Sequence, residues 1–117
     1  MESFVRLKLP APLRAAHRIH GEVIYIDTFG NLFTNISGRD LTGVAADRLV
    51  ISLRDATIRG LASNYAATDE GELVALVNSW GLLEIALNKG SARQRTAAQI
   101  GDKVEIILDE RATGGHS

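Results

Sequence analysis

Hydrophobic and polar residues alternate over short stretches of the chain, and turn residues separate these stretches, which predicts β-strands. The clearest stretch, Gly21 to Ile36, reads GEVIYIDTFGNLFTNI. It begins as a strand in which Val23, Tyr25 and Asp27 point to one side. The alternation then breaks, and a second extended run follows from Leu32 to Ile36. A polar loop between two apolar strands is a common place for binding residues, and it is also typical of a simple β-turn.

Apolar runs of strand length recur to the end of the chain. They are Leu49 to Leu53, Ala56 to Gly60 with an extended continuation to Tyr65, Glu72 to Asn78, Leu82 to Leu87, and Asp102 to Leu108. The one helix that we expect covers Ala92 to Ile100, with Ser91 as its N-cap and Gly101 as its stop. About seven short strands with at most one helix indicate an all-β fold, either an antiparallel barrel or a sandwich.

Both ends of the chain are expected to lie outside this sheet. The N-terminal part has a short extended segment, two prolines and a basic stretch, Arg14 to His20, that we expect to be a loop. We interpret residues 1–20 as a leading segment or interdomain linker, residues 21–109 as the barrel domain and residues 110–117 as a flexible tail. A proline-bearing linker favours a native polypeptide that is longer than this sequence.

Composition narrows the classes of function. The chain has 117 residues, no cysteine and a formal net charge of -1. This length fits one domain, and the absence of cysteine excludes disulfides and thiolate chemistry. The small net charge provides no field that attracts nucleic acid or an anionic membrane. No apolar run approaches the ~20 residues of a membrane span, and the N-terminus lacks the apolar core of a signal peptide, so we expect a cytoplasmic protein.

The motifs of common catalytic and nucleotide-binding sites are missing from the sequence. There is no P-loop, no GxGxxG after a strand and no GxSxG. The three histidines, His17, His20 and His116, lie near the ends of the chain, so we predict no metal site. Ser79 has no histidine base near it in the sequence. We therefore assign no catalytic residue.

Polar and aromatic residues gather at strand ends and at breaks in the alternation. They are Asp27, Phe29, Asn31, Tyr65, Asn78, Ser79, Trp80, Glu84 and Asn88. Glu84 stands in an otherwise apolar run, so it either faces inward and needs hydrogen-bond donors or faces solvent on a one-sided sheet. An asparagine amide can pair with an adenine edge, although Asn31 and Asn88 also suit turns. Aromatic residues beside turns can stack on a flat ring or cap the end of a barrel.

Taken together, four segments resemble a known family. They are Gly21 to Ile36, Asn64-Tyr65-Ala66, LVALVNSWGLLEIALNKGSA from Leu73 to Ala92, and GDKVEI from Gly101 to Ile106. They are similar to the C-terminal domain of the S-adenosylmethionine hydroxide adenosyltransferases. These enzymes are adenosine-forming S-adenosylmethionine hydrolases and are related to the fluorinase and chlorinase. The resemblance runs from about Phe4 to Leu108.

The resemblance implies a fold and partners. It implies a small antiparallel β-barrel, which in the family follows a larger N-terminal α/β domain. It also implies a homotrimer in which the ligand lies between the N-terminal domain of one subunit and the C-terminal domain of its neighbour. The ligand would be adenosine or S-adenosylmethionine, which is the substrate, and no other cofactor is implied.

The resemblance also implies residues for the adenine and sugar part of the ligand. Asp27 and Asn31 would contact the sugar-methionine part and the adenine. Phe29 would shape the pocket, and Tyr65 would pack on the adenine. The segment from Leu87 to Lys89 would offer backbone groups to the adenine edge.

Three further positions match the methionine end of the family's site. Ser79 and Trp80 match the strip near this end, and Glu84 matches a ligand-contacting carboxylate of the hydrolases. The halogenases carry an arginine at the position of Trp80, so the resemblance favours a hydrolase. The water-activating Asp, Arg and His of the family belong to its N-terminal domain and have no counterparts in this sequence.

Our leading hypothesis is the nucleoside-binding C-terminal half of an S-adenosylmethionine hydrolase, with the isolated chain not catalytic. The alternative is a structural or oligomerisation β-barrel module. A third hypothesis, an OB-like barrel for single-stranded nucleic acid, is disfavoured by the net charge of -1 and by the small number of aromatic residues.

Overall fold

Strands dominate the computed structural model of the chain, which describes residues 13–15, 18–42, 44–63 and 69–108. The strands are β1 (Leu13–Ala15), β2 (Arg18–Ile26), β3 (Leu32–Ser37), β4 (Leu49–Leu53), β5 (Ala56–Arg59), β6 (Leu73–Val77), β7 (Leu82–Leu87) and β8 (Lys103–Leu108). The helical elements of these residues are the 3₁₀ helices η1 (Gly38–Leu41) and η2 (Ala46–Arg48) and the α-helix α2 (Ala92–Thr96). The predicted all-β fold with one short α-helix is confirmed.

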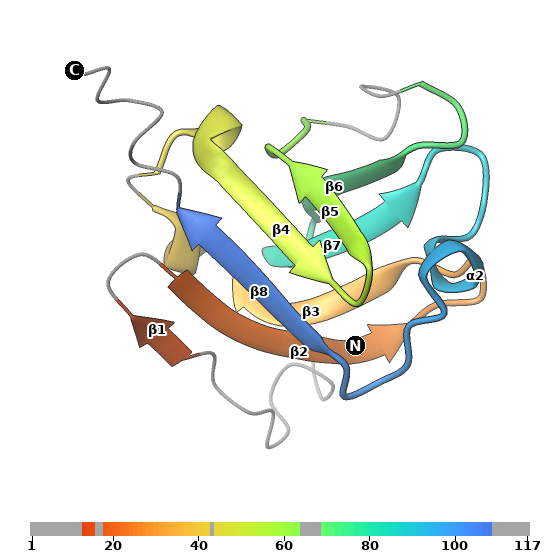
Figure 1. Ribbon diagram of the computed structural model, residues 1–117, viewed down its shortest axis with the longest axis horizontal. Helices are drawn as coiled ribbons and strands as arrows, with labels where there is room; N and C mark the ends of the chain where they lie inside the picture. Colours follow the sequence, from red (N-terminus) through yellow and green to blue (C-terminus); the bar gives the residue numbers. More distant parts are fainter. Residues whose placement is uncertain (1–12, 16–17, 43, 64–68, 109–117) are drawn as a thin grey trace.

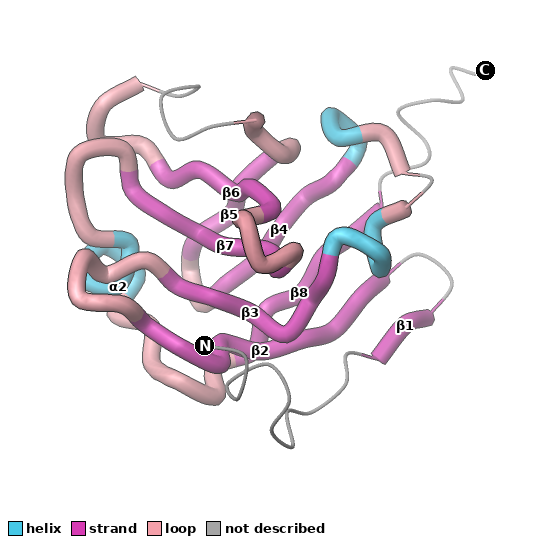
Figure 2. The backbone as a smooth tube through the Cα atoms, turned by 180° about the vertical axis from the view of Figure 1, so that it is seen from behind, coloured by secondary structure: helices cyan, strands magenta, loops and turns pink. Residues whose placement is uncertain are grey.

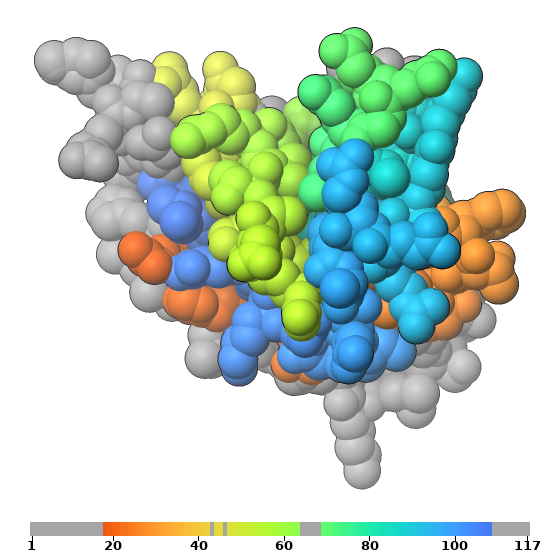
Figure 3. All heavy atoms as spheres, turned by 45° about the vertical axis from the view of Figure 1, so that its right-hand side comes forward, coloured from red at the N-terminus to blue at the C-terminus, as the bar shows by residue number. Residues whose placement is uncertain are grey.

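Seven strands form one antiparallel sheet in the order β5-β4-β8-β2-β3-β7-β6, and the sheet curls into a nearly closed barrel (Figure 1). The short β1 pairs with the beginning of β2. Because all neighbours in this order are antiparallel, an odd number of strands makes the two edge strands, β5 and β6, run in the same direction. A backbone hydrogen bond of 2.8 Å from Ala62 to Ala75 joins the chain after β5 to β6. The hairpin of β4 and β5 meets the segment around α2 on the face shown in Figure 3.

The main core lies inside the barrel. Side chains alternate along each strand, so every second residue of β4 and β8 points inward. The inward residues of these two strands are all 4% exposed or less, and they are Leu49, Ile51, Leu53, Val104, Ile106 and Leu108. Burying one such side chain stabilises the fold by about 1.5–3 kcal/mol. The two runs that were predicted as strands are strands, and the alternation of their side chains explains which residues form the core.

A second, smaller apolar cluster covers the outer face of β6 and β7. Ala75 points into the main core, and its neighbours Val74 and Leu76 point to the opposite side, where they pack with Ala86 and the half-buried Ala62. Figure 2 shows β3, β7 and β6 side by side in this part of the barrel. The outer face of these strands is therefore buried in part, unlike the solvated face of a one-sided sheet.

A β-bulge in β2 overturns the prediction that Val23 and Tyr25 point to the same side. The register of β2 against β3 shifts between these two residues. Val23 is fully buried in the main core, whereas the Tyr25 ring packs against the Phe33 ring on the outer face. An extra residue in one strand of a pair reverses the alternation beyond it. The bulge thus turns the end of β2 toward the outer face.

Two further predictions about elements were wrong. The stretch from Arg14 to His20 was expected to be a loop, but β1 and the start of β2 lie there, because pairing with β8 satisfies the backbone of Arg18 to Glu22. The helix ends at Thr96 and not at Ile100, because Ala97 adopts a φ of +60° and its N–H donates to Arg93 O. The short extended segment predicted before the two prolines lies outside the described residues.

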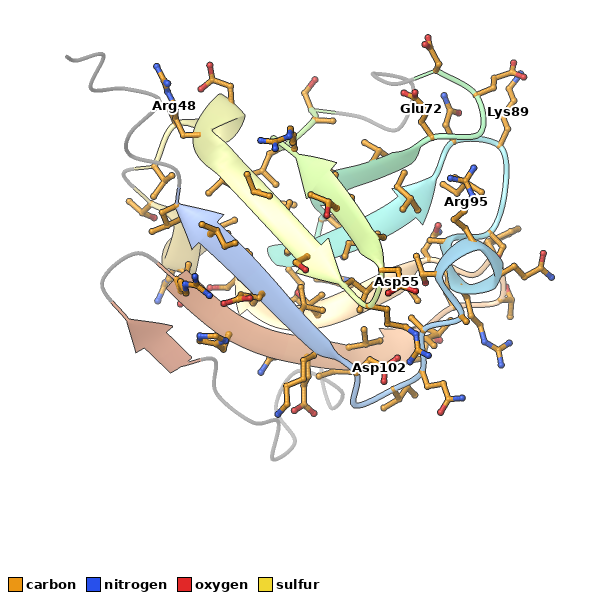
Figure 4. The ribbon with its side chains drawn as sticks, viewed as in Figure 1. Arg48, Asp55, Glu72, Lys89, Arg95 and Asp102 are labelled. Carbon is orange, nitrogen blue, oxygen red and sulfur yellow. The ribbon has the colours of Figure 1, made fainter. Side chains whose placement is uncertain are left out.

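Asp102 lies in the loop before β8 (Figure 4). We expect it to make the stability of the fold depend on pH. Its pKa is lowered, first by a hydrogen bond from the Gln99 backbone N–H (2.8 Å) and also by Arg54 (3.0 Å), while desolvation opposes the shift. A lowered pKa stabilises the folded state above the unfolded value of about 3.9, and this contribution is lost as the pH falls through the folded value.

We expect Asp102→Asn to lower the free energy of unfolding at pH 7. This difference from the parent should shrink as the pH falls through the lowered pKa of Asp102 in the folded state, because the parent carboxylate is then protonated as well. Urea unfolding at pH 7 and at the lowest pH at which the parent still folds measures the difference. Asp55→Asn, in the same turn as Arg54, is the matched control. An equal destabilisation by Asp102→Asn at both pH values would contradict the pKa argument.

Candidate ligand-binding site

Asp27 organises the loop between β2 and β3. Its Oδ1 accepts hydrogen bonds from the backbone N–H groups of Phe29 and Asn31, both at 2.9 Å, and its Oδ2 accepts one from Asn31 Nδ2 at 3.0 Å. Two backbone hydrogen bonds, from Asp27 to Asn31 O and from Gly30 to Asp27 O, close the turn. The carboxylate therefore fixes both the loop backbone and the orientation of the Asn31 amide.

The start of α2 supports the same loop. Gly30 has a φ of +86°, and a Cβ atom at this position would lie 2.0 Å from Ser91 Oγ. The Arg93 N–H donates to Gly30 O at 2.9 Å, and Ser91 caps the helix by accepting a hydrogen bond from the Gln94 N–H. The predicted N-cap at Ser91 is confirmed. Close packing of a glycine against this cap holds the loop beside the end of β7.

Glu84 lies on the outer face of the sheet and is nevertheless buried. It stands directly opposite Phe33 on β3 and Leu76 on β6, so the three side chains share one face. The Phe33 ring packs against the Tyr25 ring, with 5.4 Å between the ring centroids, and against the Trp80 ring, with 5.1 Å between the centroids. Glu84 is only 2% exposed. Neither sequence alternative, a core-facing or a solvated glutamate, describes this position.

Asn78 connects Glu84 to the turn between β6 and β7. Its Oδ1 accepts hydrogen bonds from the N–H groups of Trp80 (3.0 Å) and Leu82 (3.1 Å), and its Nδ2 donates to Glu84 Oε1 at 3.1 Å. In the sequence, Asn78 stood out as a polar residue but was not assigned to the site. Asparagine is a common turn residue, and Gly81 follows Asn78 at the other end of the turn. This turn pattern is the signal that could have identified Asn78.

These residues line one cavity of about 410 Å³ on the outer face. Its walls come from the end of β2, from β3, β6 and β7, and from the turn after β6. The lining residues are Asp27, Phe33, Ser63, Leu76, Val77, Asn78, Ser79, Trp80 and Glu84. Both charged lining residues are acidic. The cavity therefore suits a ligand with a cationic or hydrogen-bond-donating group and a flat apolar part.

Of the residues that the family resemblance assigned to the site, Asp27, Ser79, Trp80 and Glu84 line this cavity. The others are placed differently. Asn31 adjoins the cavity through Asp27, and Phe29 is 76% exposed at the tip of its loop. Leu87 ends β7, and the Lys89 amine beyond it pairs with Glu70 at 2.9 Å. Tyr65 lies outside the described residues.

A second cleft of about 370 Å³ lies where α2 approaches the two edge strands (Figure 4). Its lining residues are Asp55, Ala56, Thr57, Leu73, Arg95 and Thr96. The Arg95 guanidinium donates a hydrogen bond to Gly71 O. None of the predicted site residues lines this cleft.

The described part of the chain has neither a metal-binding cluster nor a membrane-spanning helix. Within these residues, no group of three histidine, aspartate or glutamate side chains is arranged to hold a metal ion. No helix among the same residues has the length and apolar character needed to cross a membrane.

The fold and the cavity define a small antiparallel β-barrel domain with an acidic, aromatic-lined cavity on its outer face. Residues 21–105 match the family of the SAM hydroxide adenosyltransferase C-terminal domain. The chain belongs to this family, and the resemblance seen in its motifs is confirmed.

Two curated relatives of the chain carry the same name. The chain is 31% identical over 107 residues to the (R)-S-adenosyl-L-methionine hydrolase of Thermus thermophilus, covering 92% of this chain and 38% of the relative. It is 30% identical over 90 residues to the enzyme of the same name from Methanocaldococcus jannaschii, covering 73% of this chain and 34% of the relative. The chain thus spans little more than a third of the length of these hydrolases.

Solved structures show the same barrel. One is the crystal structure of an uncharacterized conserved protein from Thermotoga maritima, with a TM-score of 0.74 and 33% identity. The match covers 86% of this chain and 40% of that protein. Another is a conserved hypothetical protein from Thermus thermophilus, with a TM-score of 0.66 and 29% identity, matched over 38% of its length and 85% of this chain.

Proposed function

We propose that this barrel is the substrate-binding C-terminal part of an S-adenosylmethionine hydrolase and that its outer-face cavity binds S-adenosylmethionine or adenosine. The observation that carries the proposal is the presence of two carboxylates, Asp27 and Glu84, in one cavity with the Trp80 ring. S-adenosylmethionine carries a sulfonium and an ammonium group, and carboxylates and aromatic faces both attract cations. The names of the relatives point to the same ligand.

In the complete enzyme, the oxygen of water or hydroxide would attack C5′ of the adenosyl group. The C5′–S bond would break, and methionine would leave with the electron pair. Attack by hydroxide would give adenosine directly, and attack by water would give adenosine after loss of a proton. Because the positive charge of the sulfonium disappears during this step, the site is expected to act by positioning and desolvating the nucleophile. The residues of this chain would hold the substrate in line.

The remaining parts of the site would come from outside this sequence. We propose that an N-terminal α/β domain supplies the residues that activate water, and that the site forms between neighbouring subunits of a homotrimer. Half-exposed Val77 and Trp80, 39% and 40% exposed, lie at the cavity and fit a surface that another domain covers. The isolated chain is then expected to bind the ligand weakly and to hydrolyse nothing.

Calorimetric titration of the chain with S-adenosylmethionine and with adenosine tests the proposal. The informative variant is Asn31→Ala combined with Glu84→Ala, and Glu72→Gln, at the opposite end of β6 from the cavity, is the control. We expect weak saturable binding, with a Kd of about 1 mM or below, that the double variant loses and the control keeps. Absence of saturable binding by the parent chain, or equal binding by the double variant, would contradict the proposed function.

An assembly role is the second candidate, and two exposed apolar residues favour it. Phe29 is 76% exposed and Ile100 is 64% exposed, and large apolar side chains at the surface can be buried by contact with another subunit. If assembly is the main role, the chain sediments as an oligomer that Phe29→Ser with Ile100→Ser dissociates, while ligand binding is absent or unchanged. A monomeric parent chain that binds S-adenosylmethionine excludes this candidate.

A further inference from the structure

We infer that Asn78 is a positioning residue, which orients the Glu84 carboxylate in the cavity in addition to closing the turn between β6 and β7. Its amide makes three contacts. Two belong to the turn, where Oδ1 accepts hydrogen bonds from the N–H groups of Trp80 and Leu82 at 3.0 and 3.1 Å. The third belongs to the cavity, where Nδ2 donates to Glu84 Oε1 at 3.1 Å.

The turn determines which end of the Asn78 amide faces Glu84. The backbone N–H groups of Trp80 and Leu82 can only donate, so the oxygen of the amide must lie on their side. The NH₂ group therefore faces Glu84, and the carboxylate receives a donor without a positive charge. A buried carboxylate depends on such donors, because desolvation penalises its charged form. Asn78 thus orients Glu84 while the negative charge remains available to a ligand.

The same amide couples the base of the cavity to its rim. Glu84 is 2% exposed, whereas Trp80 is 40% exposed and packs on the Phe33 ring. Trp80 is also the single tryptophan of the chain. Its fluorescence is therefore sensitive to the arrangement of the site, and it can be measured without a bound ligand.

The variant Asn78→Asp separates the two roles. An aspartate keeps an oxygen for the N–H groups of Trp80 and Leu82, so the turn is preserved, but it places a second carboxylate against Glu84. Like charges in one buried site share a proton. Besides Glu84, the titratable group among the described residues that line the cavity is Asp27. Tyr25 is also close, because its ring contacts the Phe33 ring. The substitution changes neither Asp27 nor Tyr25.

We expect Trp80 emission in Asn78→Asp to show a pH-dependent transition in addition to any that the parent chain shows, because the two neighbouring carboxylates share a proton. Adding Glu84→Gln to Asn78→Asp should abolish it, because the glutamine NH₂ can donate to the new aspartate and restore the hydrogen bond with its direction reversed. If Asn78 acts only on the turn, Asn78→Asp has the pH profile of the parent, and this result would overturn the inference.

Loss of folding in Asn78→Asp is also informative, and circular dichroism detects it. Folding recovered by the added Glu84→Gln supports the positioning role, because the repulsion has been removed. A double variant that remains unfolded overturns it, because the turn alone then explains the loss.

The meaning of this arrangement for a substrate rests on the proposed function, but the two can fail separately. The new transition without any binding of S-adenosylmethionine would refute the proposed function and support the positioning role. Binding of S-adenosylmethionine by the parent without a new transition in the variant would support the proposed function and refute the positioning role.

Discussion

Gly30→Ala is expected to lower the free energy of unfolding by about 2–5 kcal/mol. A left-handed conformation costs a residue with a Cβ atom about 1–2 kcal/mol, and Gly30 has a φ of +86°. Overpacking adds about 1–3 kcal/mol, because the new Cβ would lie 2.0 Å from Ser91 Oγ and 2.8 Å from Ser91 Cβ. Since Ser91 caps α2, the substitution disturbs the loop and the helix together.

Gly81→Ala is the matched control for this experiment. Gly81 has a φ of +80°, and nothing lies within 4 Å of a Cβ atom built on it. It therefore reports the conformational cost alone, about 1–2 kcal/mol. Urea unfolding followed by far-ultraviolet circular dichroism measures both variants. Equal losses would show that Ser91 moves aside without cost and that the loop does not depend on α2.

Asp27→Ala is expected to lower the free energy of unfolding by about 2–3 kcal/mol, because it removes the acceptor for two backbone N–H groups and for Asn31 Nδ2. The same variant should lose the binding of S-adenosylmethionine, since the loop that forms one wall of the cavity is no longer held. Urea unfolding and calorimetric titration measure the two effects.

Asp27→Asn distinguishes the charge of Asp27 from its role in the loop. An asparagine oxygen still accepts from the Phe29 and Asn31 N–H groups, and the Asn31 amide can turn to accept from the new NH₂, so the loss of stability should stay below about 1 kcal/mol. If the carboxylate attracts a cationic substrate, the affinity for S-adenosylmethionine falls about tenfold, which corresponds to about 1.4 kcal/mol, while the affinity for neutral adenosine hardly changes. Equal losses for the two ligands would exclude recognition of the charge.

The site was predictable in part because its polar residues interrupt strong strand patterns. Asp27 and Asn31 follow an apolar strand, and Ser79 and Trp80 follow another. The family motifs placed these two segments in one site although about fifty residues separate them in the sequence. In the structure, Asp27, Ser79 and Trp80 line one cavity. Asn31 is hydrogen-bonded to Asp27. Asn78 was not assigned to the site. The turn pattern around it could have drawn attention to it, but this pattern does not show its hydrogen bond to Glu84 across the turn.

The sequence by itself determined the class of fold, most strands of the barrel and the family. Alternation of apolar residues reveals which residues share a face of a strand, as in β4 and β8, and local motifs identify turns and caps such as Ser91. These features depend on neighbours along the chain, so they can be recognised without the tertiary structure.

Only the tertiary structure decided what the outer face of the barrel does. Alternation separates two faces, but it does not show what covers either one. Glu84 is buried on the outer face because Phe33, Leu76 and the turn after β6 surround it. The bulge in β2, which places Tyr25 on the same face, also arises from pairing with β3. Contacts between strands that are distant in the sequence therefore created the cavity.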